Sequence, residues 1–165
     1  MTDDALAASI ATGPHRLLEG LVGSWAGTTR TWFMPGELAD ESETTGLVRA
    51  ILGGRFVAHE YRGSLAGDEM EGHAVLGFDV APARFVCAWV DSVHTGTAVM
   101  LSEGEAAVTD TISVLGSYDA GVGPKWGWRT IFAQPSADEL LVSHFNVPPG
   151  AEEYLGVETR YHRVA

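Results

Sequence analysis

The stretch Gly23-Ser24-Trp25-Ala26-Gly27 decides the fold of this chain, because it joins a short helical pattern to a long alternating one. From Leu21 to Phe33 the small and apolar residues recur at every second position, which is the period of a β-strand. We interpret this stretch as the first strand of a closed β-barrel, with the Trp25 side chain filling one end of its interior.

The segment before this strand predicts one short helix. Residues 1–12 are polar and rich in alanine, and we expect them to be flexible. Thr12-Gly13-Pro14 is a helix start, because proline lacks the N–H that would stay unpaired at the first helical position. The helix expected from about His15 to Leu21 is too short to be stable alone. It should therefore dock on the barrel and close one end.

The segment after this strand reads as a series of further strands separated by turns rich in Gly, Pro and Asp. We expect them at 42–52, 55–62, 69–78, 84–91, 97–103, 107–115, 126–134, 140–146 and 154–164. Short turns between sequential strands favour pairing of neighbours, and a closed sheet has no exposed edge. The sequence therefore predicts an all-β fold, an up-and-down antiparallel β-barrel of about ten strands in a single domain over residues 1–165.

The charge and the cysteine content exclude several classes of function. The net charge is −12, which opposes binding to nucleic acid or to an anionic membrane. Cys87 has no partner in the chain, which excludes an intrachain disulfide and a zinc site built on cysteines. The N-terminus lacks the pattern of a signal peptide, and no apolar run is long enough to span a membrane. We therefore expect a cytoplasmic protein.

Several short motifs occur in a characteristic order along the chain. They are Leu17-x-x-Leu-x-Gly-Ser-Trp25-x-Gly27, Leu52-Gly53-Gly54-Arg55-Phe56, Glu60-Tyr61, Gly72, Leu76-Gly77-Phe78-Asp79, Trp89-x-Asp91, Thr95-Gly96 and Ser102-Glu103-Gly104. This series resembles the DUF1579 family of bacterial proteins, which is similar to calycin-type barrels such as lipocalins and nitrobindins. The resemblance covers about residues 14–164 and implies a lipocalin-like barrel of ligand size, without a defined activity.

The resemblance also implies a structural role for two residues at opposite ends of the chain. In calycin barrels a basic side chain of the last strand lies over the tryptophan of the first strand. Arg163 has the matching position here, so we expect a cation–π contact between Arg163 and Trp25.

Four titratable residues are candidates for acid–base catalysis. They are Glu60, His73, Asp91 and His144. A carboxylate buried in the barrel would have a raised pKa and could act as a general acid or base. The alternative for Glu60 is an ion pair with Arg55, Arg62 or Arg129 on a neighbouring strand.

Aromatic and other apolar side chains are candidates to line a ligand pocket. They are Tyr61, Phe85, Trp89, Met100, Trp126, Trp128 and Tyr161. Trp126 and Trp128 share one face of a strand, where they could border a flat ligand or simply fill the interior. On the first strand, Trp32 falls on the outer face and Phe33 on the opposite one, so at least one aromatic ring should lie near the surface and favour a homodimer.

The histidines do not show the spacing of a metal site, and we expect no bound metal. His15 and His94 fall in helix and turn regions, where we expect them to be solvated. The resemblance to nitrobindins implies haem as an alternative cofactor, held by a histidine of a late strand. If Trp25 and Arg163 face inward, His162 faces outward, which leaves His144 as the candidate haem ligand.

Three alternatives for the function follow from these residues. The first is binding of a small apolar or aromatic molecule, without a cofactor. The second is a cofactor-free isomerase, cyclase or hydratase that uses a buried carboxylate or histidine. The third is a nitrobindin-like haem protein.

Overall fold

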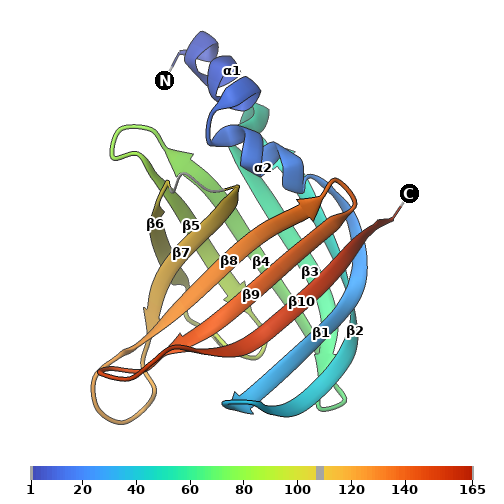
Figure 1. Cartoon of the computed structure of the whole chain (residues 1–165), viewed down its shortest axis with the longest axis vertical. Coiled ribbons are helices and arrows are strands. Elements are labelled where there is room, and N and C mark those ends of the chain that lie inside the picture. The colour runs from blue at the N-terminus through green and yellow to red at the C-terminus, as the bar shows by residue number, and fades with distance from the viewer. Residues whose placement is uncertain (1, 107–109, 165) are drawn as a thin grey trace.

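A computed structural model describes residues 2–106 and 110–164 and contains a closed antiparallel barrel with two helices at one end (Figure 1). Its elements are α1 (Asp3–Thr12), α2 (His15–Leu21), β1 (Gly23–Met34), β2 (Glu37–Ile51), η1 (Leu52–Gly54), β3 (Phe56–Leu65), β4 (Asp68–Asp79), β5 (Arg84–Asp91), β6 (Met100–Glu105), β7 (Thr111–Tyr118), β8 (Trp126–Ser136), β9 (Glu139–Val147) and β10 (Tyr154–Val164). Each strand pairs with its neighbours in sequence, and β10 returns to pair with β1. The all-β, up-and-down barrel predicted from the sequence is confirmed.

Most strand positions agree with the prediction, and the differences arise at turns. Strands β5 and β10 have the predicted bounds, whereas β2 begins at Glu37 rather than at residue 42. The tight turn at Gly36, with φ of +76°, allows β2 to pair with β1 from its first residue. Strand β6 begins later than predicted, because a turn occupies residues 92–97. The strand expected at 107–115 begins outside the described residues, and β7 is described from Thr111.

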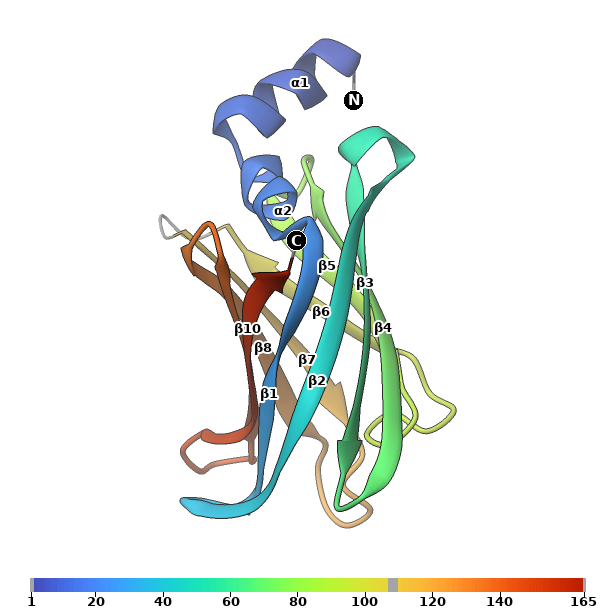
Figure 2. The same cartoon turned by 90° about the vertical axis from the view of Figure 1, so that its right-hand side faces the viewer.

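The two helices cover one end of the barrel, as Figures 1 and 2 show. Helix α2 has the predicted bounds, and its Leu18 and Leu21 are buried in the barrel core. Helix α1 is an addition, since the sequence predicts no helix at residues 3–12; its Leu6 is buried. His15 is not solvated as expected: it is 1% exposed, and its Nδ1 forms a hydrogen bond of 2.8 Å with the Ser9 hydroxyl. Among the described residues, no helix has the length and hydropathy needed to cross a membrane.

The Gly-x-Trp-x-Gly stretch is the place where the barrel closes. The contact predicted between Trp25 and Arg163 is present, with the guanidinium carbon 4.2 Å from the centre of the ring. A Cβ atom at Gly23 would collide with the Arg163 guanidinium, so glycine leaves room for this contact. At Gly27 a Cβ atom would collide with the Arg160 carbonyl group, so glycine lets β10 approach β1. Both glycines therefore serve the closure of the sheet.

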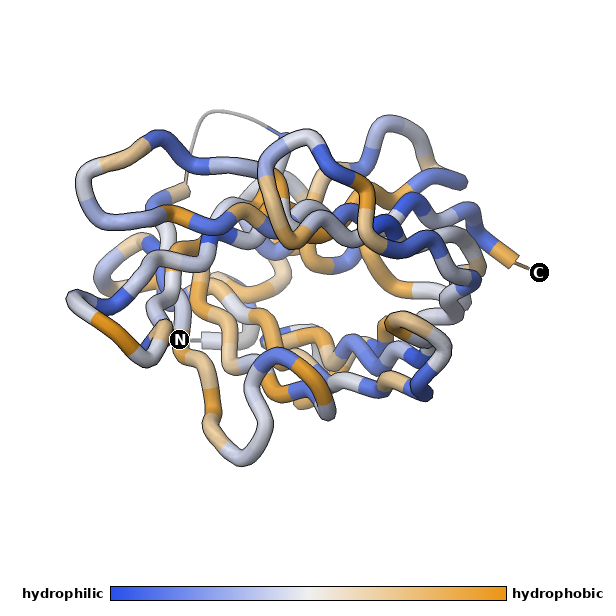
Figure 3. Tube along the Cα trace, turned by 90° about the horizontal axis from the view of Figure 1, so that it is seen from below, coloured by the Kyte–Doolittle hydropathy of each residue, from blue (hydrophilic) through white to orange (hydrophobic). Residues whose placement is uncertain are grey.

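The barrel interior changes character along its axis. Near the helices it is apolar, and Phe78 packs there against Phe85 with ring centres 5.0 Å apart. Farther along, hydroxyl groups enter the interior: Thr29 forms hydrogen bonds of 2.6 and 2.8 Å with Thr44 and Thr159. Figure 3 views the barrel from the end without helices, where hydrophobic and hydrophilic residues alternate along the strands.

Candidate functional site

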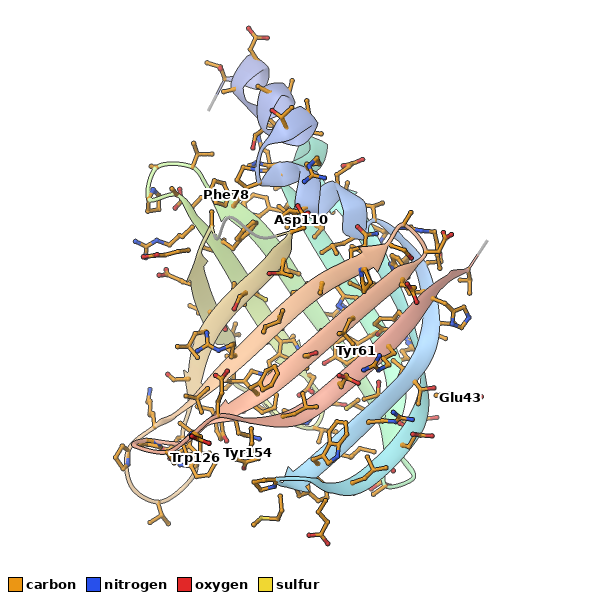
Figure 4. The ribbon with its side chains drawn as sticks, viewed as in Figure 1. Glu43, Tyr61, Phe78, Asp110, Trp126 and Tyr154 are labelled. Atoms are coloured by element: carbon orange, nitrogen blue, oxygen red, sulfur yellow. The ribbon has the colours of Figure 1, made fainter. Side chains whose placement is uncertain are left out.

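A cavity of about 280 Å³ lies at the end of the barrel that the helices do not cover. Its aromatic lining consists of Trp32, Phe33, Trp89, Tyr118, Trp128 and Tyr154. In Figure 4, Tyr154 lies at this end, Tyr61 lies about halfway along the barrel, and Phe78 lies near the helices. The volume is close to the lower limit of small-molecule pockets, which hold roughly 300–1,000 Å³. We call it the mouth pocket.

Two tryptophans and two histidines form a cluster of rings between the mouth pocket and the interior, in which Trp89, Trp128 and His144 are stacked and His94 is tilted. The indoles of Trp89 and Trp128 are parallel within 7°, with ring centres 5.9 Å apart. The centre of the His94 ring lies 5.8 Å from the centre of each indole. The centre of the His144 ring lies 5.6 Å from that of Trp89 and 5.5 Å from that of Trp128. These residues come from β5, the β5–β6 turn, β8 and β9, so the barrel brings together segments that are far apart in the sequence.

A hydrogen-bonded chain orients the Trp89 ring. Its indole N–H donates to the Tyr61 hydroxyl at 2.9 Å, and this hydroxyl donates to Asp91 Oδ2 at 3.4 Å. Burial, together with the nearby charge of Asp91, raises the pKa of Tyr61 well above its usual value. Tyr61 therefore keeps its proton and acts as a donor toward the carboxylate.

Asp91 builds the turn that carries His94. Its Oδ1 accepts hydrogen bonds from the backbone N–H groups of Val93, His94 and Thr95 at 3.2, 2.5 and 2.9 Å. Its Oδ2 lies 2.5 Å from His94 Nδ1. Burial by itself raises the pKa of Asp91, but the hydrogen bonds and charge of His94 and the backbone N–H groups outweigh it, so the pKa is lowered. Asp91 is thus an ionised carboxylate with no exposed side-chain surface.

A second, smaller chamber of about 30 Å³ lies deeper in the barrel. His144 and His59 line it, and burial lowers their pKa values to about 3 and about 4, so both are neutral at pH 7. His144 Nδ1 forms a hydrogen bond of 3.0 Å with the Thr130 hydroxyl. His59 Nε2 is buried and has no hydrogen-bond partner among the described residues. The chamber is about the size of one water molecule in the liquid.

The structure brings together two of the four predicted acid–base residues, Asp91 and His144. Glu60 and His73 lie on the outer face, because residues at odd and even positions of β3 and β4 point to opposite sides of the sheet. Glu60 forms the ion pair that was its alternative interpretation, but with Arg49 rather than with the arginines named above. The hydrogen bond from Arg49 lowers the pKa of Glu60, the opposite of a buried general acid.

The predicted ligand-binding residues divide into two groups. Five line the mouth pocket or the deeper chamber, namely Tyr61, Trp89, Met100, Trp128 and Tyr161. Phe85 instead packs at the closed end, and Trp126 contacts Tyr118 at 6.3 Å without lining either space. Trp32, expected on the outer face, lines the mouth pocket because the β1–β2 register shifts between Thr31 and Trp32.

His94 is the site residue that sequence reasoning missed. Expected to be solvated, it lines the mouth pocket, and its side chain is 24% exposed. The signal that could have found it was Asp91-Ser-Val-His94-Thr95-Gly96 at the end of a strand, where an aspartate that accepts following N–H groups initiates a turn. Such a turn brings the histidine three positions later back toward the carboxylate.

The described residues contain no group of three His, Cys, Asp or Glu side chains that could hold a metal ion. Cys87 is buried, which raises the pKa of its thiol to about 12. Haem does not fit at His144, because this residue lines only the water-sized chamber and two indole rings lie 5.5–5.6 Å from its own.

Comparisons with known proteins agree with the fold. A scan against protein families matches residues 11–163 to the family described as "Protein of unknown function (DUF1579)". A search of curated proteins finds no match. The crystal structure of Rv2717c from M. tuberculosis is similar, with a TM-score of 0.62 and 17% identity over 92% of this chain and 98% of that chain. At this identity the likeness concerns the fold alone.

Proposed function

The chain belongs to the DUF1579 family, and we propose that it binds a small, planar, largely apolar molecule in the mouth pocket. The observation that carries this proposal is the parallel pair of indoles, Trp89 and Trp128, on the wall of a cavity that opens at the end without helices. Aromatic faces prefer stacked or edge-on partners, so an exposed part of this cluster would select flat, conjugated ligands.

The surroundings of the indole pair support a preformed site. Trp89 is held by its hydrogen bond to Tyr61, and Tyr118 meets the Trp128 ring edge-on at 6.0 Å. A wall that is already ordered loses little conformational entropy when a ligand binds. The size of the cavity, about 280 Å³, suits a ligand of one or two fused rings and excludes a long acyl chain.

Titration with planar probes tests this proposal. We expect coumarin and 2-naphthol to quench tryptophan emission and to raise the melting temperature, since a ligand that binds only the folded state stabilises it. Palmitate, which is long and flexible, should do neither. The proposal is wrong if neither planar probe changes emission or melting at concentrations up to its solubility.

Two matched variants locate the binding site. Trp128→Leu removes one stacked indole, and we expect it to weaken coumarin binding by about tenfold, the upper range of an aromatic pair. Trp126→Leu removes the tryptophan two positions away on the same strand, outside the mouth pocket, and should leave the affinity unchanged. Equal losses in both variants would show that binding occurs elsewhere.

A further inference from the structure

The mouth pocket contains a base and a hydrogen-bond donor that simple binding of an apolar ligand does not require. The base is His94, held at 2.5 Å by Asp91. The donor is the indole N–H of Trp128, whose Nε1 atom is itself buried and has no hydrogen-bond partner among the described residues. His94 and Trp128 are adjacent, with ring centres 5.8 Å apart, and both line the pocket.

The environment of Asp91 determines which nitrogen of His94 carries the proton. Asp91 is ionised and can only accept hydrogen bonds, so the hydrogen between the two residues belongs to His94 Nδ1. In the neutral ring Nε2 then keeps its lone pair. No described residue forms a hydrogen bond with Nε2, so this atom can bind a ligand.

The structure of the turn after Asp91 does not require a histidine at position 94. Asp91 Oδ1 holds the turn through three backbone N–H groups, and these bonds form with any side chain at position 94. The second carboxylate oxygen is directed at the imidazole instead. A carboxylate that fixes the tautomer and orientation of a histidine is the arrangement by which enzymes prepare a general base.

We infer that His94 accepts a proton from the carbon next to a carbonyl group of a small planar ligand, while the Trp128 N–H donates a hydrogen bond to the carbonyl oxygen. Asp91 is the positioning residue of this pair. The inference rests on the proposed function, because the substrate must occupy the same pocket. The substrate class is a ketone whose neighbouring carbon carries an aryl or vinyl group, and the reaction class is a cofactor-free isomerisation.

The electrons and atoms of this step balance without a co-reactant. The C–H bond breaks, its electron pair forms a C=C bond, and the carbonyl π pair moves onto oxygen while the proton goes to His94 Nε2. Return of a proton to the same or a conjugated carbon restores the carbonyl and the neutral histidine. The stacked indoles suit the flat enolate, and a preorganised donor at the developing oxyanion lowers the barrier.

Exchange of the C1 hydrogens of 2-tetralone in D2O, followed by proton NMR, tests the inference. The protein should accelerate this exchange, and His94→Phe should remove about 100-fold or more of the acceleration, as expected for loss of a general base. Trp128→Phe keeps an aromatic ring but loses the N–H donor together with part of the stacking area, so its exchange rate is compared at saturating 2-tetralone, where we expect a loss of at least about tenfold. Trp126→Phe and His73→Phe, which lie outside the pocket, should exchange 2-tetralone like the wild type.

Binding of 2-tetralone, measured by tryptophan fluorescence on the same proteins, separates the two proposals. Failure of the wild type to bind it would count against the proposed function and this inference together. Binding without acceleration, or equal acceleration by His94→Phe, would overturn this inference and leave the binding function intact. A loss of acceleration in Trp126→Phe as large as that in Trp128→Phe would also overturn it.

Nitrogen-15 NMR tests the role of Asp91 without any substrate. In the neutral state of the wild type, the His94 shifts should be those of the Nδ1–H tautomer. Asp91→Asn keeps an oxygen for the turn but places an amide donor at Nδ1, and the Nε2–H tautomer should then predominate. A wild-type His94 with its proton on Nε2 would overturn the inference.

Discussion

At the scale of single residues, Arg163 connects the two ends of the chain. Besides its position over Trp25, it donates hydrogen bonds to the backbone carbonyls of Val22 and Ala137 at 2.6 and 2.9 Å. These carbonyls follow α2 and precede β9, so one side chain ties the helical cap to the barrel wall. Its contribution combines a cation–π contact and charge-assisted hydrogen bonds.

We expect Arg163→Met to lower the free energy of unfolding by about 2–4 kcal/mol, from the cation–π contact and the charge-assisted hydrogen bonds that it loses. Urea denaturation measures this loss. Arg160→Met is the matched control, because Arg160 lies on the outer face of the same strand with 66% of its side chain exposed. A loss in the control as large as that in Arg163→Met would contradict a special role for Arg163.

At single positions, the sequence pattern does not always determine which side chain faces the barrel interior. His59, Glu60 and Tyr61 are consecutive, and either face of their strand could have been the inner one by composition alone. The barrel turns His59 and Tyr61 inward and leaves Glu60 outside. The direction of a side chain depends on strand register, and a shift of one residue reverses it.

At the scale of elements, the seam between β1 and β10 depends on close backbone approach at Gly27. The positions from Ser24 to Thr31 pair in continuous register with those from Val164 to Val157. A Cβ at Gly27 would lie 2.7 Å from the backbone carbon of Arg160, which cannot move aside as a flexible side chain could. The strands would have to separate locally.

Gly27→Ala should therefore cost more than about 2 kcal/mol of unfolding free energy, as in overpacked cores. Thermal and urea unfolding, followed by circular dichroism, measure the effect. Ser24→Ala, an exposed position on the same strand, provides the comparison and should change stability by less than about 0.5 kcal/mol. Wild-type stability in Gly27→Ala would mean that the seam is not under this constraint.

The two helices that cover one end of the barrel, α1 and α2, differ in how far the sequence predicts them. Helix α2 has a visible start at Pro14 and apolar residues at helical spacing, so its bounds follow from local signals. Helix α1 has a weak pattern and buries Leu6, a contact that exists only once the chain has folded. Without a clear apolar face, local signals do not reveal this helix, which is why the sequence alone did not predict α1.

At the scale of the whole molecule, two buried neutral histidines couple stability to pH. The pKa values of His59 and His144 in the fold, about 4 and about 3, lie below the ordinary value of 6.5 that applies when the chain is unfolded. Below pH 6.5 the unfolded chain therefore binds more protons than the folded one. The stability that these two neutral histidines allow is therefore fully present above pH 6.5. It is lost as the pH falls toward their pKa values in the folded state.

We expect the free energy of unfolding to fall between pH 6.5 and pH 4 by up to about 1.4 kcal/mol per pH unit for each histidine. Urea denaturation at several pH values measures this slope. His59→Gln should make it shallower, whereas His162→Gln, on the exposed outer face of β10, should not. An unchanged slope in His59→Gln would show that His59 takes up protons in the folded state.

The sequence by itself determined the closed barrel and the helix before it, whereas the contact between Trp25 and Arg163 was expected from the family resemblance. The barrel and the helix follow from local period and turn residues, which act within a few positions or repeat along the chain. Only the tertiary structure decided the site, by turning Trp32 into the mouth pocket and by placing His94 beside Trp128, 34 positions away. The physical reason is that register, bulges and burial depend on strands that meet only when the barrel closes. Gly23-Ser24-Trp25-Ala26-Gly27 lies where the sheet closes, and the mouth pocket lies at the opposite end of the barrel.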